Sequence, residues 1–115
     1  MPEVGPRMAP RLKKRAEFLH VAAKGRKIPV KGLVLQALPR PGEQVRLGFT
    51  ATKKIGNAVV RNHTKRRLRE AVRLYLRQHH IAPADLVLIG RAGTAGRRFD
   101  LLIADIGQAI AKAGL

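Results

Sequence analysis

The segment "RNHTKRRLRE", residues 61–70, places five arginine or lysine residues and a single carboxylate, Glu70, within ten positions. Asn57 lies just before it and is a predicted helix N-cap. Apolar residues recur behind it at helical spacing, so we expect one helix over residues 58–78. At 100° per residue, its predicted buried face consists of Thr64, Leu68, Ala71, Val72 and Tyr75.

The charge of this helix is concentrated on a different side. One arc of roughly 80° holds five polar or basic residues and no acid, namely Asn62, Arg66, Arg69, Arg73 and Arg77. Lys65 lies between this arc and the buried face, and Lys53 and Lys54 precede the helix. An exposed helix is stabilised when acids alternate with bases at spacings of four, whereas like charges repel. The line could be an ordinary solvated face, but its one-sidedness favours an anion-binding surface.

The flanking segments predict an α+β fold. We expect a helix near residues 13–25, strands at 27–38 and 44–50, a turn or short strand at 51–55, and a final helix from near Asp100. The turn chemistry of "PRPGE", residues 39–43, predicts a hairpin between the two strands. The run "DLVLIGR", residues 85–91, does not alternate, as in a central strand covered on both faces. Residues 11–115 then form a single sandwich of one sheet and packed helices, after a flexible basic arm at residues 1–10.

The composition points to a polyanionic partner. The chain has 115 residues, is 45% hydrophobic and carries a net charge of +17, so it folds but gains from being neutralised. A membrane-surface helix would need a free apolar face, which is here required for the core. No apolar run suits a signal peptide or a membrane span, so we expect a cytoplasmic protein. A helix-turn-helix pattern is missing, which favours RNA slightly over DNA and leaves DNA open.

The acidic residues do not predict catalysis by this chain alone. The seven acids are Glu3, Glu17, Glu43, Glu70, Asp85, Asp100 and Asp105. They are scattered, whereas two-metal phosphodiester cleavage needs several carboxylates around ions about 4 Å apart. Asp100 and Asp105 could come close on one helix, but we expect cap and surface roles for them. The chain has no cysteine, which excludes a cysteine-based zinc site.

A family resemblance covers roughly residues 11–113. The stretch "GFTATKKIGNAVVRNHTKRRLREAVR", residues 48–73, closely resembles the signature of the bacterial ribonuclease P protein subunit, K-K-x-G-N-A-x-x-R-N-x-x-K-R-x-x-R. The matching residues are Lys53, Lys54, Gly56, Asn57, Ala58, Arg61, Asn62, Lys65, Arg66 and Arg69. The resemblance implies an α-β-β-β-α-β-α order and a mostly antiparallel sheet with a left-handed crossover, although connections are generally right-handed.

The resemblance also implies a function. The catalytic centre and its Mg²⁺ ions belong to an RNA subunit, and the holoenzyme removes the 5′ leader of precursor tRNA. The implied RNA-binding residues are Lys53, Lys54, Asn57, Arg61, Asn62, His63, Lys65, Arg66, Arg69 and Arg73. Phe18, Ala22 and Gln36 would line a cleft for the leader. We expect no cofactor bound by the protein itself, no membrane and no obligate protein partner. A basic ribosomal or RNA-chaperone protein is the alternative.

Three positions depart from the family pattern. His63 stands where many relatives carry arginine, so that contact should weaken and depend on pH. Ala22 and Gln36 stand where aromatic residues are expected. Stacking of a base on an aromatic ring contributes about 1–3 kcal/mol, so leader binding should depend more on charge here. Phe18 shares a helical face with Val21, which makes core packing the alternative role for its ring.

Overall fold

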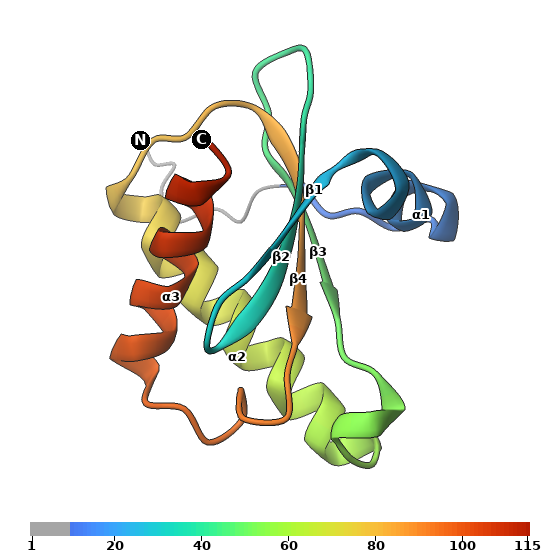
Figure 1. Cartoon of the computed structure of the whole chain (residues 1–115), viewed down its shortest axis with the longest axis vertical. Coiled ribbons are helices and arrows are strands. Elements are labelled where there is room, and N and C mark those ends of the chain that lie inside the picture. The colour runs from blue at the N-terminus through green and yellow to red at the C-terminus, as the bar shows by residue number, and fades with distance from the viewer. Residues whose placement is uncertain (1–9) are drawn as a thin grey trace.

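The computed structural model describes residues 10–115, which form one α+β domain in three layers (Figure 1). Helix α1 (Arg15–Lys24) lies on one face of a four-stranded sheet, and helices α2 (Ala58–Gln78) and α3 (Phe99–Lys112) cover the other. The predicted fold class is therefore confirmed. Residues 1–9 of the predicted arm lie outside the described part of the chain. No helix within residues 10–115 is long and apolar enough to cross a bilayer.

The sheet contains β1 (Arg26–Pro29), β2 (Leu33–Pro39), β3 (Arg46–Thr50) and β4 (Ala84–Gly90) in the order β1-β2-β4-β3. Strand β2 is antiparallel to β1 and β4, whereas β3 is parallel to β4. The predicted central strand is thus confirmed as β4. The predicted hairpin between β2 and β3 is wrong, because β4 lies between them. Alternation in β3 specifies which face is buried but not which strand is the neighbour. Helix α2 connects the parallel strands β3 and β4, and the hand of that crossover stays a prediction.

Two strand assignments also differ from the prediction. The single strand expected at residues 27–38 is two strands, because a tight turn in which the Val30 amide donates to the Leu33 carbonyl at 2.9 Å separates β1 from β2. Gly32 is required in that turn, since a Cβ there would overlap the Asp105 carboxylate. The short strand considered at 51–55 is a 3-10 turn, η1 (Lys53–Ile55).

Each face of the sheet has its own core. The larger core lies under α2 and α3 and includes Leu35, Leu47, Leu68, Leu88 and Ile106. The smaller one lies under α1, where Val21, Leu12 and Val87 are buried and Phe18, Leu38 and Ile89 pack around them. Burial of these apolar side chains, at roughly 25 cal/mol per Å², is what fixes α1 and α2 on opposite faces.

Polar contacts fix the position of α1 on its face. The buried Asp85 carboxylate accepts hydrogen bonds from Nε and Nη2 of Arg46 at 2.7 and 2.8 Å. Nη1 of Arg46 also donates to Glu17 at 3.2 Å. Glu17 Oε1 accepts the backbone N–H groups of Lys14 and Lys13, both at 2.9 Å, and so caps α1. These N–H groups, followed by the charge of Arg46, hold the pKa of Glu17 below its usual value.

The chain before α1 covers part of the β3 edge. The Leu12 amide donates to the Leu47 carbonyl at 2.8 Å, and the Leu47 amide donates to the Pro10 carbonyl at 2.9 Å. Pro10, at the end of the predicted arm, is therefore attached to the sheet. This bridge sets Arg11 beside β3 and shields an otherwise unpaired edge.

Candidate nucleic-acid interface

The start of α2 is built by three residues of the signature. Asn57 is the predicted N-cap, and its Oδ1 accepts the Val60 N–H at 3.0 Å. Gly56 has a φ of 149°, and a Cβ on it would lie 2.9 Å from two carbons of Val60. The Arg61 guanidinium donates to the Gly56 carbonyl at 3.3 Å. Arg61 is half-buried and stabilises this loop, so at least part of its role is structural.

Helix α2 packs on the core through the predicted face. Thr64, Leu68, Ala71 and Val72 are fully buried, and Tyr75 is partly buried against the same core. The cap and buried face together hold the helix rigidly. The basic side chains on the other side are therefore presented from a fixed frame.

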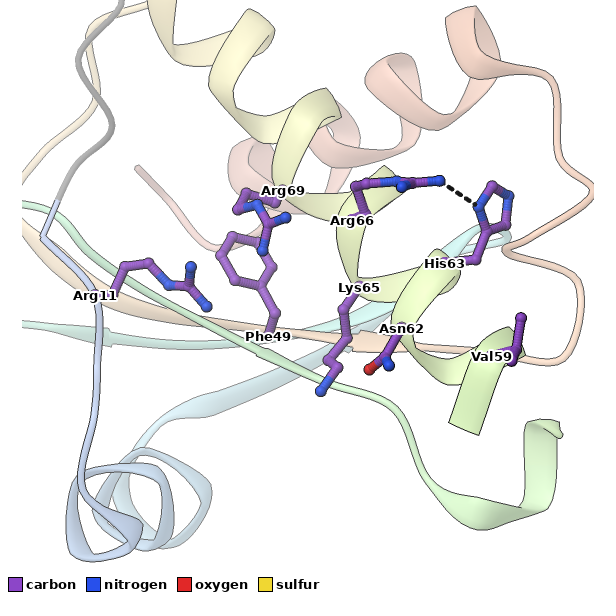
Figure 2. Close-up of a pocket in the computed structure, with 8 residues that line it drawn as sticks. All are labelled: Arg11, Phe49, Val59, Asn62, His63, Lys65, Arg66 and Arg69. Atoms are coloured by element: carbon purple, nitrogen blue, oxygen red, sulfur yellow. Dashed lines mark hydrogen bonds between the residues drawn. The ribbon is translucent and has the colours of Figure 1, made fainter. Parts of the chain in front are cut away.

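A groove of about 630 Å³ lies between α2 and the edge of the sheet (Figure 2). It is lined by Arg11, Phe49, Val59, Asn62, His63, Lys65, Arg66 and Arg69. Five of these residues, Asn62, His63, Lys65, Arg66 and Arg69, were predicted to bind RNA, and the structure brings them together. Four lining residues are lysine or arginine and none is acidic, so the groove suits an anionic ligand.

Arg11 and Phe49 belong to this groove but were not predicted from sequence. The Arg11 Cζ atom lies 5.4 Å from the centroid of the Phe49 ring, within the range of a cation–π contact. In the sequence, Leu47 and Phe49 alternate with Arg46, Gly48 and Thr50, and this pattern indicates that Phe49 is buried. No local signal pairs it with Arg11, because that proximity depends on the bridge from residues 10–12 to Leu47.

His63 is oriented by its neighbour on the helix. Its Nδ1 lies 3.3 Å from Nη2 of Arg66, and the dashed line in Figure 2 marks this contact. Because a guanidinium can only donate, Nδ1 of His63 accepts this bond and carries no proton in this arrangement.

The other predicted RNA-binding residues lie outside this groove. Lys53 and Lys54 are exposed on η1, next to the start of α2. Arg73 forms an ion pair with Glu70, three residues before it, and this hydrogen bond lowers the pKa of the Glu70 carboxyl. The predicted basic arc holds no acid of its own, but Glu70 reaches Arg73 across one helical turn and neutralises that position.

The three predicted leader residues lie on the α1 side of the sheet, whereas Phe49 points to the α2 side. Phe18 is half-buried, with its ring over Gly48 of β3. Gln36 of β2 is also half-buried and is separated from Gly48 by Val87 of β4 in the same row across the sheet. Ala22 is exposed. Phe18 and Gln36 therefore lie on the same face of the sheet, but the Phe18 ring covers β3 and Gln36 belongs to β2, with β4 between these two strands.

Carboxylates in the described chain are largely engaged by arginine. The acids that contact an arginine are Glu17, Glu70, Asp85, Asp100 and Asp105. The expected surface role of Asp105 is wrong, because its side chain is buried against Arg97, while Asp100 is exposed beside Arg98. Within residues 10–115, no three His, Asp or Glu side chains gather in a way that could hold a metal ion.

Comparisons with known proteins agree with this architecture. The sequence model of the family Ribonuclease P matches residues 7–114. The ribonuclease P protein component of Gluconacetobacter diazotrophicus is 60% identical over 108 residues, covering 93% of each chain. That of Paramagnetospirillum magneticum is 48% identical over 109 residues, covering 90% of this chain and 82% of the relative.

Solved structures show the same fold. The RNase P protein of Staphylococcus aureus superposes with a TM-score of 0.75 at 30% identity, covering 91% of this chain and 97% of that one. The RNase P protein of Thermotoga maritima superposes with a TM-score of 0.71 at 23% identity, covering 89% and 96%, which supports the fold alone. With 108 of its residues at 60% identity to one relative and nearly its whole length within the family pattern, this chain belongs to the ribonuclease P protein family.

Proposed function

We propose that the α2 groove binds the catalytic RNA subunit of ribonuclease P and that the α1 side of the sheet receives the 5′ leader of precursor tRNA. The chain would thereby assist the endonucleolytic cut that produces the mature 5′ end. The observation that carries this proposal is the groove itself. Arg11, Lys65, Arg66 and Arg69 converge there without an acidic neighbour in the lining.

The chemistry of the groove suits RNA. Arginine forks match phosphate oxygens in two-bond geometry, and the Asn62 amide can hydrogen-bond a base edge. None of the four lining cations, Arg66 and Arg69 included, has a carboxylate partner among the described residues. Their mutual repulsion in the free protein falls when phosphate binds, so RNA binding and helix stability are coupled.

The leader is assigned to the α1 side of the sheet, where fewer side chains suited to RNA binding are found than in the α2 groove. Phe18 is the aromatic residue among the three predicted there, and its ring is half-buried over Gly48. Gln36 can hydrogen-bond but offers no stacking surface. Because the two surfaces lie on opposite faces of the sheet, the RNA subunit and the leader can be bound at the same time.

Catalysis is assigned to the RNA subunit in this proposal. Five of the carboxylates already neutralise arginines, which makes them poor ligands for a hard cation such as Mg²⁺. The Mg²⁺ ions would therefore be held by RNA. The protein contributes position and charge neutralisation, not an acid, base or nucleophile.

The test is cleavage of precursor tRNA by the protein alone, by the RNA subunit alone, and by both together, in the same Mg²⁺ buffer. We expect no cleavage above background by the protein alone, and faster cleavage when protein joins the RNA subunit. Protein-only cleavage that disappears on mutation of a single acid would overturn the assignment. RNA that co-purifies with the protein separates the alternative, since ribosomal RNA in place of a structured RNA of a few hundred nucleotides would favour a ribosomal or chaperone role.

A further inference from the structure

A second basic groove, of about 790 Å³, lies away from the first, between the β1–β2 turn, the loop at residues 91–98 and helix α3. Its charged lining residues are Lys31, Arg91, Arg97, Asp105 and Lys112. None of these residues lines the α2 groove. In Figure 1 the loop at 91–98 is the orange segment that connects β4 to α3.

This loop is held in place by an arginine of α2. Arg67 donates to the carbonyls of Thr94, Ala95 and Arg97 at 2.5, 3.1 and 2.5 Å. The Thr94 hydroxyl in turn donates to the Gly32 carbonyl at 2.6 Å and accepts the Arg91 N–H at 2.7 Å. The loop is thus tied to both α2 and the β1–β2 turn. A ligand that binds this ordered loop pays little additional conformational entropy.

The groove carries an excess of positive charge. Lys31 and Lys112 are exposed and make no hydrogen bond or ion pair with any described residue. Arg91 uses Nη1 on the Val30 carbonyl at 2.7 Å, which leaves its other N–H groups available. Arg97 is the one cation here that is neutralised, by Asp105. A Cβ on Gly93 would meet no atom within 4 Å, so a phosphate can approach the loop backbone closely.

We propose that this second groove binds the sugar–phosphate backbone of the same RNA subunit that occupies the α2 groove. The inference rests on the proposed function above. Phosphate is favoured over a base because the lining has several cations and no aromatic side chain for stacking. The same RNA is favoured because Arg66 and Arg67 are consecutive residues of α2. Arg66 lines the first groove and Arg67 holds the loop of the second, so one folded RNA can reach both.

The experiment measures binding of the RNA subunit alone, without tRNA, across a series of salt concentrations. The variant Lys31→Gln/Lys112→Gln removes two charges that have no structural partner. Each lost phosphate contact should flatten the log–log salt slope by about 0.7–0.9, so the pair should lower it by about 1.4–1.8 and weaken binding roughly twentyfold at 0.15 M salt. Lys24→Gln/Lys27→Gln is the matched control. It also removes two exposed lysines, one of them in the last turn of a helix, and both lie outside the two grooves.

The outcomes separate this inference from the proposed function. A flattened slope for the Lys31/Lys112 pair, with the control pair and the melting temperature unchanged, supports the second contact. Equal slopes for the two lysine pairs overturn it. An Arg66→Ala/Arg69→Ala variant in the same series reports on the α2 groove. If that variant flattens the slope and the Lys31/Lys112 pair does not, only the second groove is refuted, whereas no change in either refutes the RNA-binding proposal itself.

Discussion

The contact between Phe18 and Gly48 allows packing and leader binding to be measured separately. A Cβ on Gly48 would lie 2.5 and 2.8 Å from Cε1 and Cζ of the Phe18 ring. The φ of Gly48 is not positive, so alanine fits its backbone, and the Phe18 ring is the main obstacle, with Leu12 Cδ1 also close at 3.2 Å. Overpacking costs about 1–3 kcal/mol, and replacing a strand glycine returns about 0.5–1 kcal/mol. Gly48→Ala alone should therefore destabilise the protein by up to about 2.5 kcal/mol.

The same methyl group should help once the ring is gone. Phe18→Ala should cost about 2–3 kcal/mol, less than the roughly 3–5 kcal/mol of a fully buried phenylalanine, because Phe18 is half-buried. In that background, Gly48→Ala fills part of the space and should be neutral or stabilising. Wild type, the two single variants and the double variant form a double-mutant cycle. Chemical denaturation of these four proteins should give a favourable coupling energy of about 1–3 kcal/mol between the two substitutions.

The functional half of the cycle uses the restabilised double variant. If Phe18 stacks on a leader base, the double variant should bind leader-bearing precursor tRNA about 1–3 kcal/mol more weakly than wild type, while mature tRNA binds equally well. Additive stabilities would refute the packing geometry. Leader discrimination that survives in the double variant would return Phe18 to a purely structural role.

Two further predictions concern the polar anchor of α1. Asp85→Asn should destabilise the protein by about 2–3 kcal/mol in chemical denaturation. This is less than the roughly 3–5 kcal/mol lost when a fully buried ion pair is broken, because the Arg46 side chain is 28% exposed. A loss near zero would mean that water replaces the hydrogen bonds between Asp85 and Arg46. Because its N–H partners lower the pKa of Glu17, the carboxylate stabilises the fold above its unfolded pKa of about 4.3, and this contribution disappears as the pH falls through the lower folded value. Glu17→Gln should therefore lower the melting temperature at pH 7 but not near pH 2, and an equal loss at both would contradict the sign.

Local signals were sufficient to predict the element that positions the site. Asn57 and the 3.6-residue spacing behind it predicted a helix over residues 58–78, and these are the observed ends of α2. The continuous apolar run of β4 predicted a central strand. These features depend on residues a few positions apart. The sequence could therefore show which side of α2 is basic before any tertiary contact was known.

Features that depend on distant residues were not predictable in the same way. The insertion of β4 between β2 and β3 overrode a turn that favoured a hairpin. Arg61 and Arg67 look like any other residue of the basic run, but each donates to backbone carbonyls, and those of Arg67 lie 27–30 residues away. Arg11 reached the groove only through its bridge to β3.

The central claim is that the basic side of α2 binds RNA phosphate, and the salt dependence of RNA affinity tests it most directly. Arg66→Ala/Arg69→Ala removes two groove cations that have no carboxylate partner among the described residues. For binding of the RNA subunit, the log–log salt slope should fall by about 1.4–1.8. The melting temperature should stay equal or rise, because repulsion along α2 is reduced. An unchanged slope, or a lower melting temperature with the slope intact, would show that these arginines are structural and that RNA binds elsewhere.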